Sequence, residues 1–184
     1  MLSQAERNQI IDLINREVVP AIGCTEPIAV ALCTARAAET LGGEPEKITV
    51  RLSANILKNA MGVGIPGTGM IGLPIAIALG ALIGKSAYRL EVLRDVDAEA
   101  VARGKRYVDE KRITIGLKEG IEEKLYIEIE AAAGDHTAVA VIAGGHTNFV
   151  FEARDGQSQL DQRGASAGEE EQNGPALSLR RVYD

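Results

Sequence analysis

The sequence predicts an α+β fold, in which N-terminal helices, a glycine-rich loop and a buried helix pack on a mainly antiparallel sheet. Helix signals dominate the early part of the chain, whereas runs of alternating polar and apolar residues cluster late. Hydrophobic residues make up 46% of the 184 residues, enough for the core of one domain. Aromatic residues are only 3%, so that core must be mainly aliphatic.

Two helices are expected near the N-terminus. Residues 3–6 form a capping box, which predicts a helix that begins at Gln4 and is ended by Pro20. Thr25 is the expected N-cap of a second helix, because Pro27 follows in the first turn, where the missing N–H costs nothing. The glycine pair at residues 42–43 predicts the end of that helix.

The middle of the chain combines a strand, a loop and two helices. Residues 47–54 alternate between apolar and polar side chains, which predicts a strand with one buried face. A glycine-rich loop is expected next, and it leads into a buried apolar helix at residues 71–83. This apolar run is interrupted by Pro74 and Gly80 and is too short to cross a bilayer. Residues 88–93 are ambiguous, and residues 97–111 predict a polar helix.

Four more strands are expected, at residues 112–117, 124–133, 137–143 and 147–153. Short turns join the last three, which predicts an antiparallel meander. From residue 155 the composition shifts toward Gln, Ser and Gly with an acidic run. We therefore expect an N-terminal α+β domain at residues 1–154 and a polar linker or disordered tail at residues 155–184.

Charge and cysteine content narrow the class of protein. The net charge of −6 argues against a nucleic-acid partner. Neither a secretory signal nor a membrane-spanning segment is visible, and two cysteines do not make a disulfide framework. We expect a reduced, cytoplasmic protein with no nucleic-acid or membrane partner.

Cys24 is the first candidate for a catalytic residue. It lies in the sequence IGCTEP, at the expected start of a helix, where free N–H groups and the helix dipole favour a thiolate. We therefore expect its pKa to be lowered, so that it can serve as nucleophile, base or metal ligand. The alternative is a small buried residue at a helix start. Cys33 is expected to face the apolar side of its helix and to be inert.

The glycine-rich loop is the second candidate site. Gly62, Gly64 and Gly67 match a dinucleotide fingerprint, but the polar residues before them do not suit the buried strand that this motif requires. An anion site for a substrate carboxylate is the favoured interpretation, and a tight structural loop is the alternative. The expected substrate-binding residues in this segment are Asn55, Lys58, Asn59, Gly67, Thr68 and Gly69.

The sequence GGHTN at residues 144–148 is the third candidate. His146 and Asn148 lie in a glycine turn between two expected strands, and we expect both to bind substrate. His136 is interpreted as a surface turn residue. No metal site is expected, because two histidines without carboxylates at ligand spacing do not make one.

Four segments together resemble the L-cysteine desulfidase family, also known as serine dehydratase alpha-chain-like proteins. They are REVVPAIGCTEPIAVAL, NILKNAMGVGIPGTGMIGLPIAIALGAL, LEVL and GGHTN, in this order between residues 16 and 148. The resemblance implies an iron–sulfur lyase that eliminates sulfide or water from cysteine or serine and releases pyruvate and ammonia. A [4Fe-4S] cluster held by three cysteines would supply the Lewis acid, and Cys24 would be the base that takes the Cα proton.

This chain departs from the family pattern because it lacks the cysteines that would hold the cluster. The resemblance therefore implies an N-terminal portion that binds no cluster by itself, is inactive alone, and has a missing C-terminal helical half as partner in cis or in trans. We also expect self-association beside residues 71–83, an apolar helix that would be left bare. The alternative is a non-catalytic binding or assembly domain with the same fold.

Overall fold

The computed structural model describes residues 3–18, 21 and 23–163. They divide into two compact units. One comprises residues 21–164, and the other comprises residues 1–20 together with residues 165–184. Each unit is described by itself.

The smaller unit contains helix α1 (Gln4–Glu17). Its capping box is confirmed, because the Ser3 hydroxyl accepts a hydrogen bond from the Glu6 backbone N–H and the Glu6 carboxylate accepts one from the Ser3 N–H, at 3.3 and 2.9 Å. Ile11, Ile14 and Val18 are exposed large hydrophobic residues on or just after this helix. The expected end at Pro20 lies outside the described residues.

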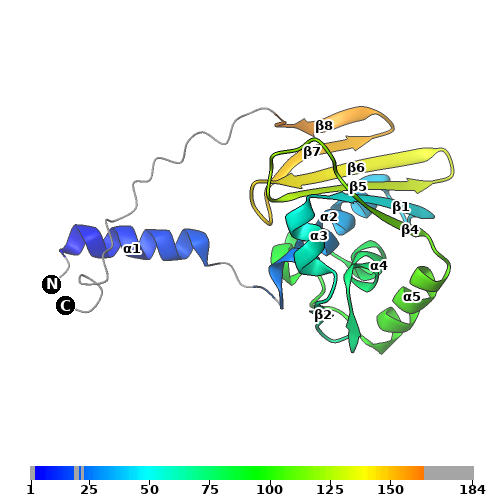
Figure 1. The fold of residues 1–184 in the computed structure, drawn as a ribbon, viewed down its shortest axis with the longest axis horizontal. Helices are drawn as coiled ribbons and strands as arrows, with labels where there is room; N and C mark the ends of the chain where they lie inside the picture. The colour runs from blue at the N-terminus through cyan, green and yellow to red at the C-terminus, as the bar shows by residue number, and fades with distance from the viewer. Residues whose placement is uncertain (1–2, 19–20, 22, 164–184) are drawn as a thin grey trace. The chain divides into compact units, whose positions relative to one another are not determined.

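The larger unit is a six-stranded sheet with helices packed on one face (Figure 1). The strand order is β4 (Ile113–Leu117), β1 (Lys47–Leu52), β5 (Tyr126–Ala133), β6 (His136–Ala143), β7 (Phe149–Arg154) and β8 (Gln157–Asp161). Only β1 and β4 pair in parallel within this sheet, and the other neighbours are antiparallel. The α+β class and the antiparallel meander are confirmed.

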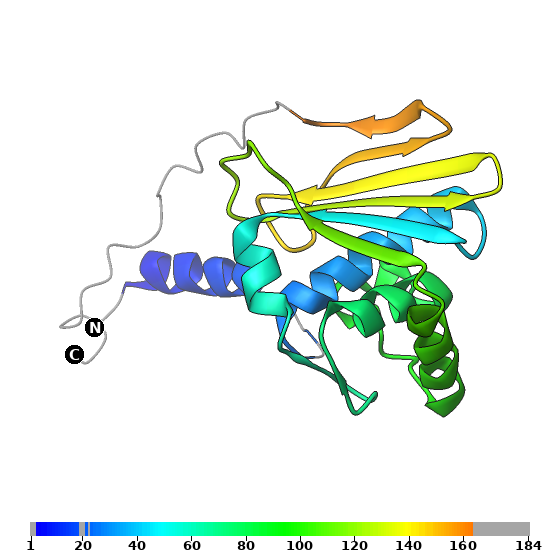
Figure 2. The same ribbon diagram turned by 45° about the vertical axis from the view of Figure 1, so that its right-hand side comes forward.

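The core lies between this sheet and helices α2 (Thr25–Leu41), α4 (Leu73–Ile83) and α5 (Ala98–Asp109). Alternate residues of the strands point into it, as the alternation predicts, and in β1 these are Ile48, Val50 and Leu52. Helix α2 crosses the sheet with most of its residues buried, and α4 packs between α2 and α5 (Figure 2). Cys33 is fully buried in α2, as expected.

The prediction of a bare apolar helix is wrong. In α4 the residues Leu73, Ile75 and Leu79 are fully buried by the unit's own elements, chiefly α2 and α5. The prediction assumed one helix on a sheet, which would leave part of α4 exposed. In the structure α2 and α5 pack against α4 from both sides and cover it. An exposed apolar helix can therefore no longer be the reason for self-association, but self-association itself stays a prediction.

The glycine-rich loop is shorter than expected. Residues 54–60 form helix α3 (Ala54–Ala60), with Ser53 as its N-cap residue. The glycines that follow build a small hairpin of β2 (Gly64–Ile65) and β3 (Met70–Ile71). The ambiguous segment is a 3-10 helix, η1 (Ser86–Glu91). The N-cap of α2 is Cys24 rather than Thr25.

The expected linker from residue 155 also needs correction. Its first part forms β8, which pairs with β7 and extends the sheet at its edge. The rest of this expected linker, residues 164–184, lies outside the described residues. In the part of the chain that the structure describes, no helix has the length and apolar character needed to cross a membrane.

The face of the sheet opposite the helices carries an ionic cluster centred on Glu128 of β5. Its carboxylate oxygens lie 2.5 Å from an Arg51 nitrogen and 2.7 Å from Lys118 Nζ, and one of them accepts a hydrogen bond from the Tyr126 hydroxyl at 2.6 Å. Arg51 is the cross-strand neighbour of Glu128 in the register of β1 and β5. Burial raises the pKa of Glu128, but these three partners outweigh it and hold the pKa below its ordinary value.

Candidate functional site

Cys24 is exposed at the N-cap position of α2 and hydrogen-bonded to a carboxylate. Its Sγ donates to Glu26 Oε2 at 3.0 Å, and the Thr25 hydroxyl donates to the same oxygen at 3.3 Å. Glu26 lies in the first turn of α2, where the helix dipole favours a negative charge. The start of this helix therefore holds a thiol–carboxylate pair.

The protonation of this pair is opposite to the expectation. The hydrogen bond to Glu26 is the main reason why the pKa of Cys24 is raised, and burial adds to it. The same hydrogen bond is the main reason why the pKa of Glu26 is lowered. A helix N-terminus favours a thiolate, but here a carboxylate occupies that favourable field and repels a second negative charge. At neutral pH the site holds a thiol and a carboxylate.

Asn59 joins this pair from a different element. Its Nδ2 donates to Glu26 Oε1 at 3.5 Å, so the carboxylate has partners from both α2 and α3. The hairpin also touches this region, because a Cβ placed on Gly23 would lie 2.7 Å from Pro66 Cγ. Gly23 has a φ of 101°, which few other residues adopt. Close approach of the hairpin therefore requires glycine immediately before Cys24.

The GGHTN turn lies between β6 and β7 and also acts on the pair. The charge of His146 makes a small contribution to the lowered pKa of Glu26, after the hydrogen bond from Cys24. Asn148 Nδ2 donates to the Ala143 carbonyl at 2.9 Å and closes the turn. Thr147 accepts a hydrogen bond from Arg89 Nη2 at 3.2 Å.

The structure brings together only some of the expected substrate-binding residues. Thr68 is buried, and its hydroxyl donates to the Ile65 carbonyl at 2.7 Å and accepts from the Met70 N–H at 2.9 Å. It closes the hairpin turn, for which Gly67 and Gly69 supply positive φ angles. These three residues have a structural role in the hairpin that the sequence analysis offered as the alternative.

Lys58 and Asn55 are exposed on α3, and they do not join Glu26. Asn55 lines a separate pocket of about 490 Å³ with Ser53 and Lys118, at the ends of β1 and β4. The dinucleotide motif also fails, because Gly62 follows a helix and Gly64 begins a hairpin strand, whereas the fingerprint requires a strand followed by a helix. His136 is exposed and contacts Asp155 at 3.0 Å, as expected of a surface residue, but it is the first residue of β6 rather than part of the turn.

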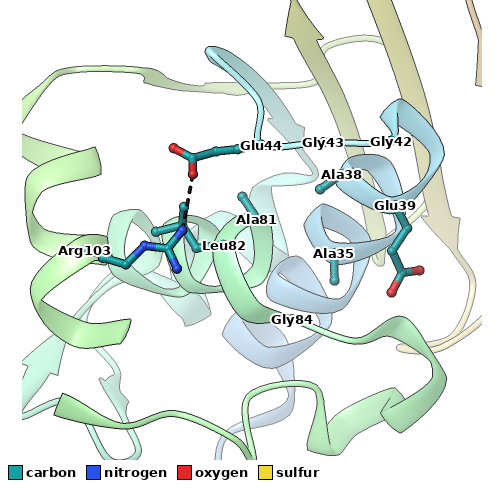
Figure 3. A pocket seen from close by; sticks show the side chains of 10 residues that line it. All are labelled: Ala35, Ala38, Glu39, Gly42, Gly43, Glu44, Ala81, Leu82, Gly84 and Arg103. Carbon is teal, nitrogen blue, oxygen red and sulfur yellow. Dashed lines mark hydrogen bonds and ion pairs between the residues drawn. The ribbon is translucent and has the colours of Figure 1, made fainter. Parts of the chain in front are cut away.

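A pocket of about 420 Å³ lies at the other end of α2 (Figure 3). Gly42 and Gly43 line it with the end of α4, and Arg103 donates to Glu44 across it at 3.3 Å. The ion pair between Arg103 and Glu44 is thus part of the lining of this pocket. The pocket is separate from the thiol–carboxylate pair, which is at the N-terminal end of the same helix.

Two contacts were missed from the sequence, that of Glu26 with Cys24 and that of Arg89 with the GGHTN turn. Glu26 is part of the quoted IGCTEP motif, two positions after Cys24, and was treated only as a helix-start signal. Arg89 had no local signal, because its partner Thr147 is 58 positions away. Within the described residues, no group of three or more His, Cys, Asp or Glu side chains is arranged to hold a metal ion.

Comparisons with known proteins identify relatives of this chain. A UPF0597 protein from Phocaeicola vulgatus is 66% identical over 184 residues, and UPF0597 protein BF3560 from Bacteroides fragilis is 64% identical over 183 residues. A UPF0597 protein from Porphyromonas gingivalis is 47% identical over 189 residues. All three alignments cover 100% of this chain but only 43 to 44% of the relative. The chain therefore spans less than half the length of these curated relatives.

No family model and no solved structure matches the chain. The relatives bear the name UPF0597 and not that of a lyase, so the expected assignment to the L-cysteine desulfidase or serine dehydratase alpha-chain-like family is corrected to similarity with UPF0597 proteins. The expected identity as a truncated iron–sulfur lyase has no support from these names.

Proposed function

We propose that residues 21–164 carry a proton-transfer site for a small polar molecule, in which Cys24 and Glu26 act as a pair. The observation that supports the proposal is the 3.0 Å hydrogen bond from an exposed thiol to a carboxylate in the first turn of a helix. By contrast, the thiol of Cys33, which is buried within α2, faces backbone carbonyl oxygens of the sheet, at 3.4 Å from Ala140 and 3.8 Å from Ile127.

The pair exchanges one proton. In the resting state the proton is on Cys24 and Glu26 is ionised, in line with the raised pKa of the thiol and the lowered pKa of the carboxylate. When the S–H bond breaks and the proton passes to Glu26 Oε2, the sulfur retains the electron pair as a thiolate. The N–H groups at the start of α2 favour that thiolate once Glu26 is neutral. The thiolate can then remove an acidic proton from a bound molecule.

The substrate class that we propose is a small amino acid, such as serine or cysteine. At rest, before it takes the proton, Glu26 carries a negative charge that attracts an ammonium group, and Asn59 adds an amide at Glu26 Oε1. Cys24 and Asn59 are both exposed, so a small molecule can reach them. Because the relatives are more than twice as long, we also propose that the remainder of such a protein covers this open site, in cis or in trans.

The test is protection of Cys24 from alkylation. Iodoacetamide labelling is followed residue by residue with mass spectrometry, with and without L-serine, which does not itself consume the reagent. Millimolar L-serine should slow the labelling of Cys24, and it should do so less in an Asn59→Ala variant. The matched control is Asn55→Ala, which alters an exposed amide on the same helix that does not contact Glu26. Labelling that is equally fast at every serine concentration contradicts the proposed function.

Two further expectations stay predictions. We expect the chain by itself to bind no iron–sulfur cluster, which iron and sulfide analysis after anaerobic reconstitution would test. We expect self-association of the chain, which size-exclusion chromatography with light scattering would test. A clean monomer at high concentration contradicts the second expectation.

A further inference from the structure

Two large hydrophobic side chains are exposed at the base of the β2–β3 hairpin. Ile71 of β3 is 70% exposed, and Met61, the C-cap residue of α3, is 54% exposed. In the register of the hairpin Ile71 pairs with Gly64, which has no side chain that could cover it. Met61 lies close by, because a Cβ placed on Gly72 would lie 2.9 Å from the Met61 carbonyl oxygen. We call Met61, Gly64 and Ile71 the hairpin patch.

The sequence around the hairpin patch carries no charge. Between Lys58 and Lys85 there is no Asp, Glu, Lys or Arg. Thr68, the one polar side chain of the hairpin, is buried and donates to the Ile65 carbonyl within its own turn. The buried centres of protein interfaces are depleted in charged residues and enriched in Met, and exposed apolar patches mark interaction sites. The outer surface of the hairpin therefore has the composition of an interface.

The hairpin patch borders the thiol–carboxylate pair. Asn59 Nδ2 donates to Glu26 Oε1 at 3.5 Å, and Met61 follows Asn59 two positions later, at the end of the same helix. Pro66 of the hairpin approaches Gly23, the residue before the thiol, since a Cβ placed there would lie 2.7 Å from Pro66 Cγ. From these contacts the hairpin extends away from the sheet (Figure 1, Figure 2). A protein segment that covered the patch would therefore lie beside the pair.

We propose that the hairpin patch is the docking surface for the part of the longer protein that lies outside the matched residues. The Phocaeicola vulgatus and Bacteroides fragilis relatives have more than half of their length in that part. The inference rests on the proposed function, and it names the surface that holds this part over the Cys24 site. The docked face should offer aliphatic or aromatic side chains to Met61 and Ile71. It should carry little charge, because a charge buried against an uncharged hairpin would lose its hydration.

Labelling of introduced cysteines provides the test. Ile71→Cys places a thiol in the hairpin patch, and Leu117→Cys is the matched control, because Leu117 is 49% exposed on the edge strand β4. Each variant is made in this chain and in a full-length chimaera, in which this chain replaces the 184 matched residues of the Phocaeicola vulgatus relative. Iodoacetamide labelling is followed residue by residue with mass spectrometry, so that Cys24 and the introduced cysteine are measured separately.

Ile71→Cys should react about tenfold or more slowly in the chimaera than in the chain by itself, because its thiol then reacts only when the docked part opens. Leu117→Cys should react at similar rates in both proteins. Equal rates for Ile71→Cys in the two proteins overturn the docking surface. A rate in the chain by itself that falls as its concentration rises assigns the patch to a second copy of the chain, and this also overturns the proposal.

A chimaera that unfolds without cooperativity is replaced by the native full-length relative from Phocaeicola vulgatus. Hydroxyl-radical footprinting, normalised to the unfolded proteins, should then oxidise the segment aligned with residues 61–72 more slowly in that relative than in this chain. Equal oxidation in the two proteins contradicts the proposal. None of these measurements uses serine, so their failure is distinct from failure of the proposed function, which would appear as a Cys24 that L-serine does not protect.

Discussion

The replacement of Glu26 by Gln should make Cys24 more reactive. Glu26 Oε2 lies 3.0 Å from Cys24 Sγ and carries the negative charge that keeps the thiol protonated. Removal of that charge lowers the pKa of Cys24, so that more thiolate is present at any pH below the pKa. The free N–H groups at the start of α2 then favour the thiolate without opposition.

The size of the effect follows from the distance. Two unit charges 3.0 Å apart repel each other by about 1.4 kcal/mol in the dielectric of water, which is appropriate for exposed groups. This free energy corresponds to a factor of about ten in the thiolate fraction, and therefore in the alkylation rate. The Gln side chain still offers an oxygen to the thiol, so a rise of about threefold to tenfold is expected near neutral pH.

The assay is the second-order rate constant of iodoacetamide at Cys24 as a function of pH, from about pH 6 to about pH 10. In the wild-type protein the rate rises with pH through the raised pKa of Cys24, and in Glu26→Gln the midpoint should lie at lower pH. Glu99→Gln is the matched control, because it removes a carboxylate from the first turn of α5, where no thiol is present. A folded Glu26→Gln protein with the wild-type midpoint, or a higher one, would refute the pairing of thiol and carboxylate.

Three further predictions, two substitutions and one labelling experiment, concern the packing and the ionic cluster. Gly80→Ala should lower the free energy of unfolding, measured in urea melts, by about 1 to 3 kcal/mol, because the new Cβ would lie 2.5 Å from the Ala31 carbonyl oxygen. The control Gly116→Ala should show no loss in the same melts, because its Cβ would have no neighbour within 4 Å. Cys33 should react with a thiol reagent only after unfolding, since burial raises its pKa, and a fast reaction in the native protein contradicts this. Glu128→Gln should cost about 1 to 3 kcal/mol at neutral pH. The lowered pKa of Glu128 means that its contribution is present above the ordinary carboxyl range and is lost as the pH falls, so acid melts of wild type and variant should converge.

The parts of the fold that could be predicted are those with a local pattern. The capping box at Ser3 and the alternation in β1 are complete within a few residues, and neither depends on what packs against it. The antiparallel meander of β5, β6 and β7 follows from alternation together with short turns. The parallel pairing of β4 with β1 could not be predicted in this way, because it joins strands that are distant in the sequence.

The missed elements have weak local patterns and depend on their surroundings. Helix α3 has only seven residues and stands next to a glycine-rich segment, so its sequence was interpreted as part of the loop. Strand β8 has only one apolar residue, Leu160, and its backbone hydrogen bonds come from pairing with β7. In both cases the tertiary neighbour decides the local structure.

The candidate site also has one feature that could be predicted from local sequence and one that could not. The position of Cys24 at a helix start could be predicted from the motif, because the cap and the proline lie beside it in the sequence. The sign of its pKa shift could not, because two opposing influences act at the same place. The helix N-terminus favours the thiolate, while the Glu26 carboxylate disfavours it. Only the direction in which the Glu26 side chain turns decides which influence is larger.

That direction changes the chemistry that the site can perform at rest. Had the Glu26 side chain turned toward solvent, Cys24 would be a thiolate base ready to remove a proton, as the motif alone suggested. With the hydrogen bond of 3.0 Å in place, Cys24 is instead a proton donor and Glu26 the acceptor. Any activity that uses Cys24 as a base must first remove its proton, and Glu26 is the acceptor in contact with it, so the loss of Glu26 should raise thiol reactivity while it removes that acceptor. A thiol that did not contact Glu26 would show no such rise, since its pKa would not depend on the charge at position 26.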